Sequence, residues 1–299
     1  MRKAGTVLAG FTVLLMSASA FAGELNPPPG PVTATDRVAL HPEAGVPIII
    51  NEPGSYVLMG PVLDCIGCDD APNSGIVISA SDVTLDCNGF QIVGDPENSF
   101  NGIFIDFLTE NITIRNGIVR NWSSGGITAG GSSGVTLENM RVFGNGFNGG
   151  AGGISISSEA RIIDCVVRDN DGTGVFVGFG SLIRGTTATG NNGHGIQTVP
   201  GALSNGSVIE NCVSRGNVGD GFNLADGTII RGSSATQNGG SGIVLAPGSA
   251  ATGCTAVFNS GSGFEASNAL VHSSAAYNNS GTDITLFNNA VAIDSHDAP

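Results

Sequence analysis

Lysine is absent from residues 23–299, and basic charge of any kind is scarce in that part of the chain. Nine arginines are present there against 25 acidic residues, which gives a net charge near −16. A chain this acidic repels polyanions at long range. We therefore expect no nucleic acid among its partners.

Long apolar runs are missing after residue 22. Residues 1–22 combine Arg2 and Lys3 with an apolar stretch and end in Ala20-Phe21-Ala22. This pattern is typical of a secretory signal peptide that is cleaved after a small residue. We expect its removal on export to the periplasm or the medium, and we expect no membrane span in the remainder.

Glycine, at 47 of 299 residues, follows a repeating pattern. A glycine followed by an apolar residue recurs every 21 to 27 positions, and 21 is the basal spacing. Periods of this length indicate stacked repeats. The glycines that carry the pattern are Gly75, Gly102, Gly126, Gly153, Gly174, Gly195, Gly221, Gly242 and Gly263.

An asparagine column precedes these glycines. The preference of asparagine for turns explains its presence here but does not explain why it recurs at the same position of each repeat. Stacked amides that hydrogen-bond from one coil to the next explain both, so we predict an asparagine ladder. Its members are Asn121, Asn145, Asn170, Asn191, Asn217, Asn238, Asn259 and Asn279.

Apolar pairs at strand spacing, such as Ile112 and Ile114, lie between the glycine and asparagine columns. One such unit cannot bury its apolar face alone, whereas parallel stacking buries it and pairs the backbone. The pattern predicts an all-β solenoid of about ten coils over residues 51–289. Residues 23–50 are predicted as a linker and N-terminal cap, and residues 290–299 as a tail without strands.

The repeat is similar to that of the right-handed parallel β-helix proteins, the pectate-lyase-like superfamily. The resemblance spans roughly residues 54–290, and residues 54–58 and 83–90 look like the first coils of secreted bacterial members. It implies a right-handed single-stranded parallel β-helix. It also implies a polysaccharide as the ligand class and leaves calcium open as a cofactor.

Six cysteines in an exported chain point to an oxidising compartment. Three of them fall at one repeat position two coils apart, and about 9–10 Å exceeds the Cα separation that a disulfide allows. We predict buried free thiols at Cys165, Cys212 and Cys254. One disulfide is predicted among Cys65, Cys68 and Cys87. No zinc set is complete, and we predict no metal site.

Another repeat position carries alternating charges. Arg184, Glu210 and Arg231 align on successive coils beside an inward isoleucine. We expect an outward-facing ion ladder that supports the stacking of the coils rather than a catalytic set.

Ionisable residues are densest over three successive coils. Carboxylates and a histidine can share acid and base roles, so the candidate catalytic residues are Asp169, Asp171 and His194. Residues 193–196 resemble a fragment of the polygalacturonase pattern, although the paired aspartates and the Arg-Ile-Lys of that family are absent. The alternative is that His194 is an ordinary turn residue. The candidate substrate-binding residues are Asp164, Arg168, Arg215, Asp220 and, as a stacking platform, Trp122.

Two functions remain open at this point. One is an exported, monomeric, carbohydrate-associated binding or surface module whose partner is a polysaccharide or a surface protein. The other is a lyase, hydrolase or epimerase that acts on a cell-wall or acidic glycan. Because no complete catalytic set is present, we favour binding.

Overall fold

The computed structural model describes residues 37–42, 47–63, 74–147, 151–199 and 206–297. These residues form strands and no helix, so none of them forms a helix that could cross a membrane. The predicted signal peptide, Cys65 and Cys68 lie outside the described residues.

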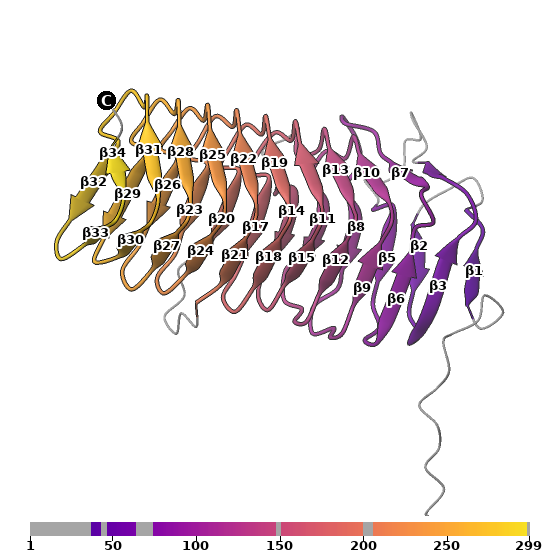
Figure 1. Cartoon of the computed structure of the whole chain (residues 1–299). Helices are drawn as coiled ribbons and strands as arrows, with labels where there is room; N and C mark the ends of the chain where they lie inside the picture. The colour runs from indigo at the N-terminus through magenta and orange to yellow at the C-terminus, as the bar shows by residue number, and fades with distance from the viewer. Residues whose placement is uncertain (1–36, 43–46, 64–73, 148–150, 200–205, 298–299) are drawn as a thin grey trace, which may run out of the picture. The chain divides into compact units, whose positions relative to one another are not determined.

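Three parallel sheets run along the described chain, and each coil contributes one short strand to each sheet (Figure 1). Sheet A has twelve strands. They are β1 (Val38–Leu40), β3 (Gly54–Leu58), β6 (Val83–Asp86), β9 (Thr113–Arg115), β12 (Thr136–Glu138), β15 (Arg161–Ile163), β18 (Leu182–Arg184), β21 (Val208–Glu210), β24 (Ile229–Arg231), β27 (Ala250–Thr252), β30 (Leu270–His272) and β33 (Val291–Ile293).

Sheet B follows the turn that leaves sheet C, and it has eleven strands. They are β2 (Ile48–Ile50), β5 (Ile76–Ile78), β8 (Asn101–Ile105), β11 (Gly125–Ala129), β14 (Gly152–Ile156), β17 (Val175–Val177), β20 (Ile196–Thr198), β23 (Phe222–Leu224), β26 (Ile243–Leu245), β29 (Phe264–Ser267) and β32 (Ile284–Phe287).

Sheet C follows sheet A after a short corner, and it also has eleven strands. They are β4 (Val62–Leu63), β7 (Gln91–Val93), β10 (Ile118–Arg120), β13 (Arg141–Phe143), β16 (Val166–Arg168), β19 (Thr187–Thr189), β22 (Val213–Arg215), β25 (Ser234–Thr236), β28 (Thr255–Val257), β31 (Ala275–Tyr277) and β34 (His296–Asp297).

The core lies between the three sheets. In one coil, Ile103 and Ile105 of sheet B, Ile114 of sheet A and Val119 of sheet C are each 0 % exposed. The same inward positions recur because the strands pair in constant register, and alternate residues of a strand point to opposite faces. The predicted all-β parallel solenoid is confirmed, with about eleven coils instead of ten.

The ends of the solenoid differ from the sequence expectation. Strands β1 and β2 pair with β3 and β5, so part of the segment 23–50 adds strands to sheets A and B. Strand β33 pairs with β30, so the prediction of a tail without strands was wrong. Both segments contain short apolar runs that continue the sheets without the glycine column.

A ladder of asparagine side chains joins seven coils, and its members are buried except for the half-buried Asn279. In each step the side-chain Nδ2 donates to the next Oδ1 at 2.9–3.0 Å, and the backbone N–H of the same residue donates to that oxygen as well. The ladder confirms the prediction for Asn145, Asn170, Asn191, Asn217, Asn238, Asn259 and Asn279.

The two ends of the ladder are specified by other residues. Asn121, predicted as a member, is not one: the backbone N–H of Trp122 takes that place and donates to Oδ1 of Asn145 at 3.1 Å. At the other end, Oδ1 of Asp283 accepts from Nδ2 of Asn279 at 2.7 Å. A carboxylate accepts without needing a further acceptor, which suits a terminal position.

The repeat-position cysteines are buried free thiols, as predicted. Hydroxyls of the intervening coils accept the backbone N–H of Cys165 and Cys212, and a serine accepts that of Cys254. Cys87 is also a buried free thiol, so the predicted disulfide does not include it. Burial raises the pKa of Cys87 to about 12 and those of Cys165 and Cys212 to about 11.

These four thiols are expected to resist alkylation in the native protein. The raised pKa values lower the thiolate fraction, by about 100-fold at Cys165 and Cys212, and burial blocks access as well. Iodoacetamide labelling followed by peptide mass spectrometry, with and without denaturant, measures this. Ready labelling of Cys87 or Cys165 in the native protein would contradict the packing described here.

Asn191→Ala is expected to lower the free energy of unfolding by about 3 kcal/mol or more, since it leaves several buried ladder groups without partners. Chemical denaturation measures the loss. Asn192→Ala is the matched control, because the side chain of this exposed neighbour bonds only to the half-buried Asp171 and its loss should cost under about 1 kcal/mol. Equal losses in the two variants would show that the ladder is not a main source of stability.

Candidate functional site

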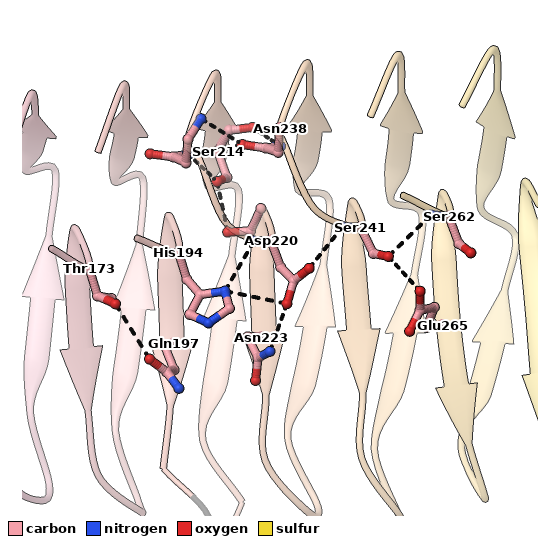
Figure 2. A network of polar contacts seen from close by, with 12 residues as sticks. Thr173, His194, Gln197, Ser214, Asp220, Asn223, Asn238, Ser241, Ser262 and Glu265 are labelled. Atoms are coloured by element: carbon pink, nitrogen blue, oxygen red, sulfur yellow. Dashed lines mark hydrogen bonds and ion pairs between the residues drawn. The ribbon is translucent and has the colours of Figure 1, made fainter. Parts of the chain in front are cut away.

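Polar side chains line up along sheet B and along the turns that lead into it, over five successive coils. We call this set the sheet B row, and Figure 2 shows it. Its turn positions precede an inward glycine, and its strand positions are the outward middle residues of the strands. The row consists of Thr173, His194, Gln197, Asp220, Asn223, Ser241, Ser262 and Glu265.

His194 and Asp220 occupy the same turn position on adjacent coils and contact each other. Nδ1 of His194 accepts a hydrogen bond from the backbone N–H of Asp220 at 3.0 Å and lies 3.3 Å from Oδ2 of its carboxylate. The neutral imidazole therefore carries its hydrogen on Nε2. Protonation of Nδ1 would replace the backbone contact with an ion pair to the carboxylate.

Further contacts orient the Asp220 carboxylate on two sides. Oδ2 accepts from Nδ2 of Asn223 at 2.8 Å, and Oδ1 accepts from the backbone N–H of Ser241 at 2.8 Å (Figure 2). The Ser241 hydroxyl then donates to Oε1 of Glu265 at 2.6 Å. The side chains of four coils are thus linked in one chain of contacts, which limits their freedom before any ligand binds.

The pKa of Asp220 is lowered in the folded protein. Burial alone would raise it, but the contact with His194 and the hydrogen bonds from Asn223 and Ser241 outweigh burial. At neutral pH this group is a carboxylate, which accepts hydrogen bonds and cannot serve as a general acid.

The residues predicted from the sequence as one cluster are divided by the fold. Asp164 lies at the corner between β15 and β16, at the opposite end of sheet C from the turn that carries His194. Arg168 and Arg215 point outward from sheet C, and Asp169 pairs with Arg168. Asp171 shares a turn with Thr173, but its carboxylate bonds to Asn192 at 2.6 Å.

Among the predicted site residues, His194 and Asp220 are therefore the two that the sheet B row brings together. The seven ionisable residues that the sequence places on three successive coils therefore do not form one cluster. Residues equivalent by period lie on one line along the solenoid, whereas residues a few positions apart within a coil lie on different sheets.

Trp122 is not a surface platform, because it is 0 % exposed. Its indole Nε1 donates to the carbonyl of Ile92 at 3.1 Å, within the first coils. Gly75, Gly94 and Gly102 leave the space for the ring, since a Cβ on any of them would lie within 3 Å of an indole atom. The indole is a packing element.

Sequence reasoning missed the neutral members of the row. Gln197, Asn223 and Ser241 are ordinary polar residues in a turn-rich sequence, and nothing in their type marks them. Their position relative to the repeat glycine was the available signal: each stands one residue before that glycine or two residues after it.

The described residues contain no group of three or more histidine, cysteine or carboxylate side chains that could hold a metal ion. The contacts of the row are hydrogen bonds and one histidine–carboxylate pair. What the row offers a ligand is a line of hydrogen-bond donors and acceptors with fixed orientation.

Comparison with known families and structures agrees with the fold. The family model "Right handed beta helix region" matches residues 67–203 and 150–260. No curated protein matches the sequence. The match to this family confirms the expected right-handed β-helix.

Three solved structures are similar at low sequence identity. The Dettilon tailspike protein gp208 has a TM-score of 0.60 at 13% identity over 80% of this chain and 55% of that chain. The GH87 α-1,3-glucanase catalytic unit of Streptomyces thermodiastaticus strain HF3-3 has a TM-score of 0.56 at 12% identity, covering 87% and 63%. The A-module of the mannuronan C-5 epimerase AlgE4 from Azotobacter vinelandii has a TM-score of 0.53 at 14% identity, covering 82% and 87%.

Asp220→Asn is expected to lower the free energy of unfolding at pH 7 by roughly 2 kcal/mol, because hydrogen bonds to a charged acceptor are replaced by weaker ones. The pKa of Asp220 is lower in the folded protein than in the unfolded chain, where it is near 3.9. The charged carboxylate therefore stabilises the fold above about pH 3.9, and this stabilisation is lost as the pH falls through the folded pKa. The deficit of the variant should therefore shrink below about pH 4. Denaturation at pH 7 and pH 3 measures it.

Asp226→Asn, an exposed carboxylate at the far end of β23, is the control and should change stability little at either pH. A deficit for Asp220→Asn that stays the same at pH 3 would mean that the carboxylate charge is not what the contacts stabilise.

Proposed function

The chain belongs to the right handed beta helix region family, and from that premise we propose that its sheet B row binds a polysaccharide. The observation that carries the proposal is the line of polar side chains from Thr173 to Glu265. Thr173 contacts Gln197, and the residues from His194 to Glu265 form a second, longer chain of contacts. Polysaccharides present hydroxyls at regular intervals, and a solenoid presents equivalent side chains about 4.8 Å apart along its axis. A glycan chain lying along sheet B would meet donors and acceptors on every coil.

The chemistry of the row suits binding to sugar hydroxyls. Amides of Gln197 and Asn223 offer a donor and an acceptor each, and the carboxylates of Asp220 and Glu265 accept from hydroxyl pairs. Because these side chains already hold one another, little rotamer entropy is lost on binding. The names of two similar structures, an α-1,3-glucanase and a mannuronan epimerase, support a carbohydrate ligand.

The setting of this activity is part of the same proposal. We take the mature chain to begin at residue 23, after removal of the signal peptide, and to act in the periplasm or outside the cell as a monomer. A surface protein that carries the glycan is the alternative form of the partner.

A lyase, hydrolase or epimerase acting through the row is the second candidate, and two observations favour it. Nδ1 of His194 lies 3.3 Å from the Asp220 carboxylate, so the tautomer with its hydrogen on Nδ1 would donate to that carboxylate and leave Nε2 free to act as a base. The carboxylates of Asp220 and Glu265 both contact Ser241 on the coil between them, so two carboxyl groups flank one point of the row, and a carboxyl pair is what glycosidases use. Product formation on a glycan panel that disappears in His194→Gln would establish catalysis.

Asn223→Ala is expected to weaken glycan binding about tenfold, because one ligand contact worth near 1.4 kcal/mol is lost. A glycan panel with and without calcium, followed by titration of the best ligand, measures the dissociation constant. Asp164→Asn is the control, because it changes a polar side chain at the opposite corner of sheet C. Asparagine tolerates the left-handed backbone conformation at that position.

Binding that falls equally in Asn223→Ala and Asp164→Asn would place the glycan elsewhere. Absence of binding across the whole panel would refute the proposal.

A further inference from the structure

The nine described arginines are unevenly divided among the three sheets. None lies on sheet B, whose strands carry a single charged residue, Glu265. Sheet A mixes both signs, with Asp86, Glu138 and Glu210 among its arginines. In the strands of sheet C from β7 to β31, arginine is the only charged residue type, and no strand contains an acidic residue. These arginines are Arg120, Arg141, Arg168 and Arg215.

The arginines of sheet A are largely neutralised by carboxylates. Arg37 and Arg115 both contact Asp86 at 3.2 Å, and Arg231 contacts Glu210. The strand register also places Arg184 beside Glu210, as the sequence predicted. This face therefore has little net positive charge to offer a ligand.

The arginines of sheet C are held mainly by neutral partners. Nε of Arg120 donates to Oε1 of Gln91 at 2.9 Å, and Nε of Arg215 donates to Oε1 of Gln237 at 3.0 Å. The guanidinium of Arg168 lies over the ring of Phe143, 4.3 Å from its centroid. A glutamine or an aromatic ring orients a guanidinium without cancelling its charge.

The carboxylate of Asp169 contacts this face, and a ligand anion can take its place. Asp169 pairs with its sequence neighbour Arg168, with the two side chains 58% and 43% exposed. Exposed pairs of this kind contribute under about 1 kcal/mol, so a ligand anion can replace the carboxylate. Asp164, at the corner before β16, also adjoins the face.

Three of the four arginines stand on consecutive coils. The register pairs Arg120 with Phe143 and Phe143 with Arg168, while Arg141 lies two residues before Phe143 on the same strand. Arg120, Arg168 and Arg215 thus share one line along the outside of sheet C at intervals of two coils, about 9–10 Å, and Arg141 lies beside that line. Figure 1 shows β10, β13 and β22 along one side of the solenoid.

We infer that this outer face of sheet C, the arginine face, binds the carboxylate or phosphate groups of an anionic polysaccharide. It is defined by Arg120, Arg141, Arg168 and Arg215. Guanidinium forks match both anions in bidentate geometry. The face is separate from the sheet B row and does not depend on the function proposed for that row.

A glycan fits this face better than a nucleic acid does. Double-stranded DNA carries a charge about every 1.7 Å, and a chain with a net charge near −16 repels such a density before contact. An anionic glycan is more sparsely charged. Screening limits the repulsion from the other faces to about 8 Å at physiological salt, so a local arginine face can still attract it.

The test compares two double variants of the full chain that lose equal charge. Arg141→Gln/Arg168→Gln removes two arginines from sheet C, and Arg161→Gln/Arg184→Gln removes two from the neighbouring coils of sheet A. Binding is titrated with polygalacturonate for carboxylate, phosphomannan for phosphate, dextran as a neutral polymer and single-stranded DNA. Thermal unfolding verifies that both variants fold.

We expect at least one anionic glycan to bind the wild type, with affinity falling at least tenfold in the sheet C variant and less than twofold in the sheet A variant. The glycan whose affinity falls in the sheet C variant shows whether the face binds carboxylate or phosphate groups. Equal losses in both variants would overturn the inference, because binding would then follow overall charge. Tighter binding of DNA, or binding of neither anionic glycan, would overturn it as well, and the dextran result reports separately on the sheet B row.

Discussion

Stacking in constant register is the constraint on which the rest of this structure depends. Each coil must place its inward residues, its turn glycine and its ladder asparagine directly over those of the coil before. The ladder amides from Asn145 to Asn279 enforce this, because a coil that slipped would leave donors and acceptors unpaired in the core. Intervals between ladder members vary from 20 to 26 residues, yet the contacts are the same. Extra residues are accommodated without disturbing the ladder.

The same constraint decides where chemistry can be built. Inward positions must stay apolar or have their polar groups hydrogen-bonded, as the ladder amides and Ser214 do, so variation is left to the outward positions and the turns. A side chain there meets its equivalents one coil away, and contacts run along the axis, as from His194 to Asp220 and from Ser241 to Glu265. Sites on such a fold are lines rather than points, which favours extended polymers as ligands.

Each sheet presents its own line to solvent, and the lines differ in charge. Sheet B offers hydroxyls, amides and carboxylates, sheet A offers paired charges, and sheet C offers arginines with neutral partners. An acidic chain can therefore carry a basic face without losing its overall charge. The fold places these lines on different sides of the solenoid, and residues close in sequence, such as Arg168 and Asp171, lie on different faces.

The sequence by itself determined the parallel solenoid, the asparagine ladder and the three stacked free thiols, because each rests on a period that only repeated in-register coils produce. It also pointed to His194 and Asp220, which share one repeat position. Tertiary structure alone decided that Trp122 is buried against glycines, that Cys87 is a free thiol in the core, and that Asp164 and Asp169 lie apart from His194. The reason is geometric. The spacing of the repeat shows which residues occupy equivalent positions on successive coils, but the turns between strands decide on which sheet those positions lie and which other side chains they contact.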